Sequence, residues 1–224
     1  MALQNPINLS FFEFFIELTL NNHKSWFDIN RTRYEKHVRE PFIELCEQII
    51  GRMSEFDATF AELEPKKCIF RINKDIRFSK DKTPYKTHYA ASFHVGGRMK
   101  MWPGGIYLEL GPEGCGIYSG VYMPEKEDLP KFRQNIANRI PDFQNAINAP
   151  DFIRFFGQVQ GEKNKILPSE LREAAVREPL IFNKQFYVGH RFEAEKALEQ
   201  DFVEYVIQVW QAASEFNRIL GGFN

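Results

Sequence analysis

The spacing of apolar residues changes twice along this chain, and that change limits the folds open to it. Up to Met53 the apolar residues recur with the three-to-four-residue spacing of helices. From Phe70 to Tyr122 they alternate with polar residues or gather in short segments, as is typical of strands. Beyond Asp128 the helical spacing returns. Helices at both ends of a strand-rich middle predict an α+β fold.

The N-terminal part shows three helix starts. Ser10 and Glu13 have the spacing of a capping box, which predicts a first helix over residues 11–20. Ser25 is suited to cap a second helix, and Pro41 to begin a third. One face of the second helix carries Phe27, Arg31, Tyr34 and Val38.

The middle of the chain predicts an antiparallel sheet. Its strand candidates are residues 70–78, 87–95, 105–110 and 116–122. GPEG, residues 111–114, predicts a hairpin between the last two. Because the other turns are also short, we expect consecutive strands to pair as a β-meander of about four or more strands.

The C-terminal part predicts helices over residues 129–140, 141–147 and 151–156, and a long last helix that ends at Gly221. Residues 166–192 are punctuated by Pro168, Pro179 and Gly189, so we expect loop, short helix and one possible strand there. The sequence has no internal repeat or obvious linker. We therefore expect residues 1–224 to form a single α+β domain, with the sheet packed against the N-terminal and C-terminal helices.

Composition narrows the class of protein. The formal net charge of -1 argues against a surface that coats nucleic acid, although it allows a local basic site. Three widely spaced cysteines suit a reducing compartment. The first ten residues carry no export signal, and Glu13 and Glu17 interrupt the apolar run FFEFFIELTL well short of a membrane span. We expect a cytoplasmic protein without a membrane segment.

One segment departs from this neutral balance. FRINKDIRFSKDKTPYK, residues 70–86, carries six cations against two carboxylates, Asp75 and Asp81. If residues 71–79 form one strand, Arg71, Asn73, Asp75, Arg77 and Ser79 project from the same face. A carboxylate between two guanidiniums stays ionised and holds their planar forks in place. The remaining positive charge suits a phosphate, sulfate or carboxylate.

These residues predict an anion-binding pocket on the polar face of the sheet. Arg71, Asp75 and Arg77 would form its floor, the turn after them one wall, and the second helix would close over it. The rings of Phe70, Phe78 and Tyr85 indicate that part of the segment is enclosed. The candidate ligand-binding residues are Arg31, Tyr34, Arg71, Asp75, Arg77, Ser79, Asp81, Lys82, Tyr85 and Lys86.

Three interpretations of this segment stay open. The favoured ligand is a small phosphorylated metabolite or a nucleotide. In the second interpretation, less favoured, a lysine-rich turn contacts nucleic-acid phosphates while exposed aromatics stack on bases. In the third, the charges are only an ion network that specifies the fold. Whether the protein is an enzyme is also open, because Asp75 and Asp81 are the only nearby candidate bases and the cations keep both acidic.

We expect neither a cofactor nor a metal. Walker, Rossmann and G-x-S-x-G motifs are absent from the sequence. His88 and His94 would share a strand face, but they lie too far apart along it to chelate one ion. The cations around Asp75 and Asp81 would weaken the binding of Mg²⁺. Oligomeric state and protein partners are left open.

The segment RFSKDKTPYK, preceded by an Arg and an Asp, resembles the hallmark of a widespread uncharacterised family, the domain of unknown function 2461 family. WFDINRTRYEKHVREPF is similar to the family's motif W-F-x-x-x-R-x-x-Y followed by Pro. GGIYLELGPEGCGIYSGVYMP resembles its glycine-rich hairpin, and KFRQNI the helix start after it. The resemblance covers most of the chain and implies a cytosolic single-domain protein, with no established activity. Lys74 departs from the pattern, which has Arg there, so it keeps the charge but loses bidentate geometry.

Overall fold

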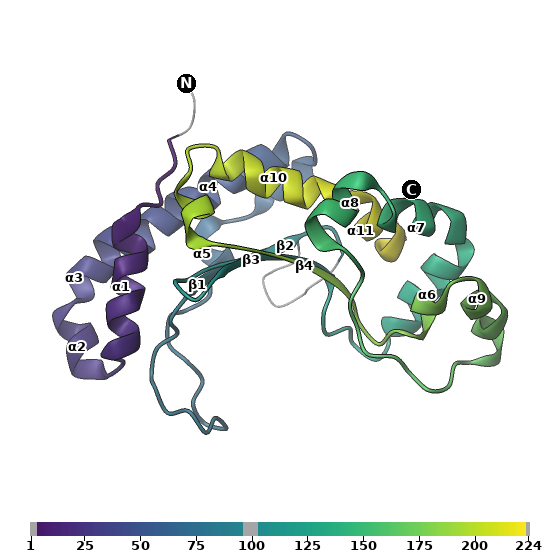
Figure 1. Cartoon of the computed structure of the whole chain (residues 1–224), viewed down its shortest axis with the longest axis horizontal. Helices are drawn as coiled ribbons and strands as arrows, with labels where there is room; N and C mark the ends of the chain where they lie inside the picture. Colours follow the sequence, from purple (N-terminus) through teal and green to yellow (C-terminus); the bar gives the residue numbers. More distant parts are fainter. Residues whose placement is uncertain (1–3, 96–102, 223–224) are drawn as a thin grey trace. The chain divides into compact units, whose positions relative to one another are not determined.

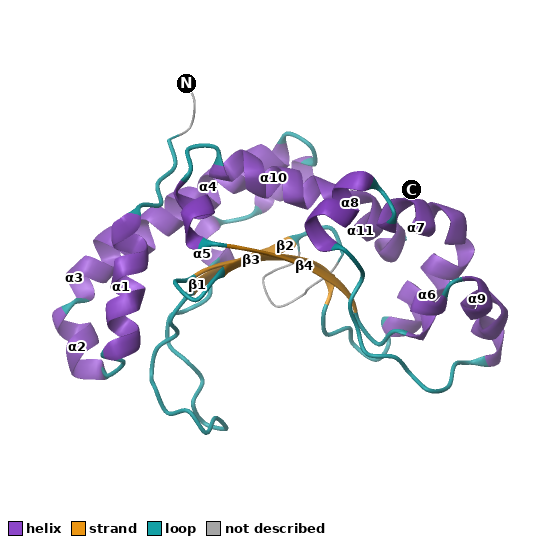
Figure 2. Ribbon diagram, in the orientation of Figure 1, coloured by secondary structure: helices purple, strands orange, loops and turns teal. Residues whose placement is uncertain are grey.

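The computed structural model describes residues 4–95 and 103–222. Four antiparallel strands form one sheet (Figure 2). Neighbouring strands pair in the order β1-β2-β3-β4. The strands are β1 Tyr89–Phe93, β2 Ile106–Leu110, β3 Cys115–Val121 and β4 Phe186–Phe192. The α+β class and the antiparallel meander are confirmed, and β4 is the possible strand expected within residues 166–192.

The described residues divide into two compact units. The first comprises residues 4–95, 107–116 and 191–207, and the second residues 103–106, 117–190 and 208–222. That the whole chain is one domain stays a prediction.

Helices make up most of the first unit (Figure 1). Asn8 caps the first of them with its side-chain oxygen, which accepts from the backbone N–H of Ser10, so the predicted capping box at Ser10 and Glu13 is wrong. His23, not Ser25, caps the second by accepting from Trp26 N–H. The helical elements are α1 Leu9–Leu20, α2 Lys24–Ile29, α3 Arg31–Tyr34, a π-helical turn Glu35–Arg39, α4 Glu40–Ser54, a 3₁₀ turn Ala58–Glu62, α5 Pro65–Cys68 and a 3₁₀ turn Ala194–Leu198.

Phenylalanine rings fill the core of the first unit. The Phe11 ring stacks on Phe42, with 6.1 Å between centroids, and the Phe42 ring lies 4.9 Å from that of Tyr89 in β1. Phe14 and Phe15, on the same helix as Phe11, have no exposed surface. Such rings bury a large apolar area and stabilise the packing of α1 in the first unit.

The second unit gathers the remaining helices around β3 and β4. They are α6 Leu129–Asn138, α7 Ile140–Ile147, α8 Pro150–Phe156, a 3₁₀ turn Ser169–Leu171, α9 Arg172–Arg177, a 3₁₀ turn Pro179–Phe182 and α11 Ser214–Gly221. Phe216 of α11 packs against Phe143 and Phe152. Gly120 in β3 has a φ of +90°, and a Cβ there would lie 2.3 Å from the Phe186 carbonyl oxygen, so only glycine fits.

The last helix is interrupted. Instead of one long helix, the chain forms α10 Phe202–Ala212 and then α11, with Ala213 between them. Gly222 adopts the left-handed conformation that ends α11, which agrees with the predicted stop at the paired glycines.

The predicted strand over residues 70–78 is absent. An isolated bridge joins Asn73 of the segment to Tyr85, while a second bridge joins Ile69, just before the segment, to Ala91 of β1. Phe70 N–H also donates to Ala90 O at 2.9 Å. Beyond them Asp75 turns the chain, because its carboxylate accepts from the backbone N–H of Arg77 two residues later. Side chains of residues 71–79 therefore do not alternate between two faces of a sheet.

Candidate functional site

Residues 70–86, which we call the basic loop, leave the start of β1 as two arms joined at a tip (Figure 1). Backbone hydrogen bonds pair the arms near their base: Lys74 N–H donates to Pro84 O at 2.9 Å, and Lys86 N–H donates to Ile72 O at 2.8 Å. Ile72 is buried, so the base packs into the first unit. The paired arms hold the base while the tip, residues 75–82, extends beyond it.

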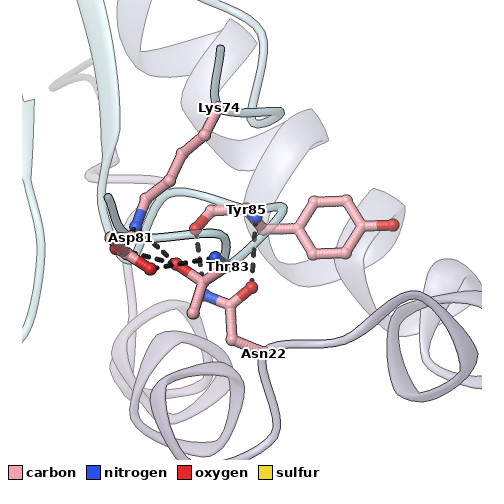
Figure 3. A network of polar contacts seen from close by, with 5 residues as sticks. All are labelled: Asn22, Lys74, Asp81, Thr83 and Tyr85. Carbon is pink, nitrogen blue, oxygen red and sulfur yellow. Dashed lines mark hydrogen bonds and ion pairs between the residues drawn. The ribbon is translucent and has the colours of Figure 1, made fainter. Parts of the chain in front are cut away.

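The N-terminal helices anchor the returning arm. The Asn22 side-chain amide donates to Tyr85 O at 2.9 Å and its oxygen accepts from Tyr85 N–H at 3.1 Å (Figure 3). The Tyr85 ring points away from these bonds and stacks on Phe27, with 4.1 Å between ring centroids. Tyr85 is only 5% exposed. Tyr85 therefore anchors the loop, and its ring is not part of an open binding surface.

A second contact network joins Lys74 on the outgoing arm to Asp81 in the tip and to Thr83 on the returning arm. The Lys74 ammonium donates to Asp81 Oδ2 and to Thr83 Oγ1, each at 2.7 Å (Figure 3). Asp81 in turn accepts from the Thr83 backbone N–H at 2.9 Å. The hydrogen bond from Lys74, followed by those from Thr83, lowers the pKa of Asp81 to about 2. Lys74, Asp81 and Thr83, which we call the latch, therefore have a structural role.

The tip carries an ion pair and an exposed ring. Arg77 donates to both carboxylate oxygens of Asp75, at 2.9 and 2.6 Å, which lowers the pKa of Asp75. The Arg77 side chain is 75% exposed, so this pair stands in water and adds little to stability. Phe78 beside it is 95% exposed, so it does not belong to the enclosed part of the segment, which includes the buried Tyr85 and Ile72.

The remaining predicted residues of the loop lie apart. Arg71 is exposed on the outgoing arm and Ser79 is half-buried in the tip. Lys82 crosses the tip to donate to Ile76 O at 2.9 Å. The Lys86 ammonium lies 5.3 Å from the centroid of the Phe70 ring. The flat floor of aligned guanidiniums is thus absent, because the strand that would align them is absent.

The two predicted contributors from the helices are engaged elsewhere. Arg31 donates to Asp28 at 2.8 Å and lies over the Phe27 ring. The buried Tyr34 hydroxyl donates to the Tyr89 hydroxyl at 2.9 Å, and burial raises the pKa of Tyr34. The structure shows neither side chain contacting the charged tip.

Two surface hollows lie away from the loop. One is formed by residues 4–10 with Glu44, Leu198 and Gln200. The other is lined by α7, α8 and the described residues of α10 and α11, with Asp142, Asp151 and Glu215 among its side chains. Neither hollow is lined by a residue of the basic loop.

Within the part of the chain that the structure describes, no group of three His, Cys, Asp or Glu residues is placed to hold a metal ion. No helix in residues 4–95 or 103–222 is long and apolar enough to span a bilayer.

Sequence reasoning missed the residues that hold the loop, Asn22, Phe27 and Thr83. Thr83 had a usable signal, since Asp-x-Thr before a proline is typical of a side-chain-bonded turn. Asn22 and Phe27 had none, because they lie about sixty residues away from the arm that they contact.

Comparisons with known proteins support the resemblance. A family model described as conserved hypothetical protein (DUF2461) matches residues 10–218. No curated protein and no solved structure gives a significant match to the chain.

Proposed function

This chain belongs to the DUF2461 family of conserved hypothetical proteins, and we propose that its basic loop binds phosphate-bearing anions. The observation that carries the proposal is the charge left over at the loop. Its two carboxylates are each paired inside the loop, Asp75 with Arg77 and Asp81 with Lys74. Among the cations of the basic loop that the structure describes, Arg71, Lys80 and Lys82 form no salt bridge with a carboxylate, and we take their charge to be available to a ligand. The charge of Arg71 also helps to lower the pKa of Asp75.

An open loop favours a ligand with several phosphates. Lys80 and Lys82 are exposed on the tip, and Arg71 is exposed on the outgoing arm. Because no wall excludes water, each contact is screened, and affinity has to come from several charges acting together. A small metabolite with one phosphate would meet few of these cations at once. The proposal concerns binding and assigns no reaction, and a cytoplasmic location stays a prediction.

The held base makes the loop suitable for this role. Asn22 and the latch fix both arms before any ligand arrives. A loop that is already ordered loses less conformational entropy on binding than a flexible loop does. The unmatched cations are therefore carried by one ordered loop rather than by a chain that must first fold.

Binding of inorganic polyphosphate, measured by isothermal titration calorimetry at 50 and 200 mM salt, tests the proposal. We expect the wild-type chain to bind, and to bind more weakly at the higher salt. The variant Lys80→Ala/Lys82→Ala should bind more weakly and with less salt dependence.

The control is Lys163→Ala/Lys165→Ala, which removes two exposed lysines from the second unit. It has the same change of net charge and should bind as the wild type does. Equal affinity of the two double variants would overturn the proposal, as would a wild type that binds no polyphosphate at 50 mM salt.

A further inference from the structure

We infer that the phosphate-bearing ligand is single-stranded nucleic acid, with one base stacked on Phe78. This inference rests on the proposed function and adds the class of ligand. Phe78 is 95% exposed. Among the described residues, no other large apolar side chain is as exposed. Its ring stands on the same tip as Lys80 and Lys82.

The ring has a specific setting. The Arg77 guanidinium lies over it, 5.8 Å from the ring centroid, and Asp75 holds that guanidinium with two hydrogen bonds. An aromatic ring among cations is what proteins use to bind single strands: the cations follow the phosphates and the ring takes a base. Other exposed apolar residues, such as Leu20 in α1 and Val176 in α9, do not lie in such a basic segment.

A single strand fits this arrangement better than a duplex does. Bases within a duplex are stacked on one another, so a lone ring on a loop reaches only a base that is unpaired. The strand's phosphates would meet the cations on either side of the ring, from Arg71 to Lys82.

A lipid surface is less consistent with the same tip. Phe78 is its one strongly exposed apolar side chain, since Ile76 is half-buried. Insertion would also bring the carboxylates of Asp75 and Asp81 against anionic headgroups. One apolar side chain with a few cations gives marginal membrane affinity.

Fluorescence anisotropy with the full chain tests the inference. The probes are a labelled 12-nucleotide single-stranded DNA, the same strand made abasic, and the corresponding duplex. We expect Phe78→Ala to weaken binding of the single strand about 5- to 150-fold, from the usual strength of base–aromatic stacking. Binding of the abasic strand should not change, because it keeps every phosphate and has no base.

Two further variants separate stacking from other effects. Phe78→Trp keeps a stacking surface and should bind the single strand at least as well as the wild type. Phe56→Ala removes another exposed phenylalanine, 56% exposed and outside the loop, and should leave binding unchanged.

The outcomes distinguish the two proposals. If the wild type binds none of the probes and no polyphosphate, phosphate binding itself is overturned. If the abasic strand binds as tightly as the complete one and Phe78→Ala has no effect, only the stacked base is overturned. Equal affinity for the duplex would refute the preference for single strands. Capture by phosphatidylserine vesicles that depends on Phe78, without oligonucleotide binding, would replace nucleic acid by membrane.

Discussion

The anchor between Asn22 and Tyr85 gives a direct test of how the basic loop is held. Replacing Asn22 by Ala removes two hydrogen bonds, one of 2.9 Å to Tyr85 O and one of 3.1 Å from Tyr85 N–H. A typical bond of this kind contributes about 0.5–1.5 kcal/mol, so the pair contributes about 1–3 kcal/mol. The Phe27–Tyr85 stacking does not involve Asn22 and should survive the substitution. The loop should therefore open locally more often, with the fold kept.

Hydrogen exchange reports that opening at single amides. The N–H groups of Lys74 and Lys86 bond across the arms, to Pro84 O and Ile72 O. A loss of about 1–3 kcal/mol in the opening free energy accelerates their exchange about 5- to 150-fold. Amides of α11, in the second unit, provide the internal control and should be unaffected. Unchanged exchange at Lys74 and Lys86 would show that Asn22 does not hold the loop.

Two further predictions concern buried polar groups of the first unit. Burial lowers the pKa of His94 to about 4, so the unfolded chain, with a pKa of about 6.5, binds more protons, and stability should fall as the pH drops from 6.5 to 4. The free energy of unfolding that this group removes reaches about 2 kcal/mol at pH 5. Urea titrations at pH 7 and 5 should therefore show a smaller loss of stability for His94→Gln than for the wild type. An equal loss in both would mean that His94 is not the group responsible. Tyr34→Phe leaves the buried Tyr89 hydroxyl without its 2.9 Å partner and should cost about 1–3 kcal/mol in urea unfolding. Tyr34→Phe/Tyr89→Phe should cost less than the sum of the single changes, and strict additivity would mean that the two hydroxyls do not interact.

The periodicity of the sequence predicted strands β2 and β3 and most of the helices. β2 and β3 with their GPEG hairpin lie within a residue of the predicted ranges. β2 alternates between buried and half-buried residues, and GPEG marks the turn after which β3 begins. The helices were found but several of their ends were not. Asn8 and His23 compete with Ser10 and Ser25 as caps, and which one wins depends on where the preceding chain is held by the rest of the fold.

The basic loop shows where periodicity stops being informative. Alternation from Phe70 to Phe78 is real in the sequence, yet within residues 4–95 and 103–222 no strand pairs with the segment along its length. Charged residues then bond to one another locally: the Asp75 carboxylate accepts hydrogen bonds from the backbone N–H and from the side chain of Arg77. A strand depends on neighbouring strands that a single stretch of sequence does not reveal. The sequence therefore predicted a polar strand face for a segment that forms a turn.

The geometry also separates two roles among lysines that the sequence presents as one cluster. Lys74 is bound by Asp81 and Thr83 between the arms, whereas Lys82 donates only to a carbonyl oxygen and Lys80 is exposed at the tip. A carbonyl oxygen leaves the charge of an ammonium unneutralised, while a carboxylate cancels it. The charge of Lys74 is thus used to join the arms, and the proposed function assigns only Lys80 and Lys82 of these three to a ligand. A lysine suits this place, because its ammonium has three donors and can bond to a carboxylate and a hydroxyl at once, whereas a planar guanidinium fork favours one carboxylate.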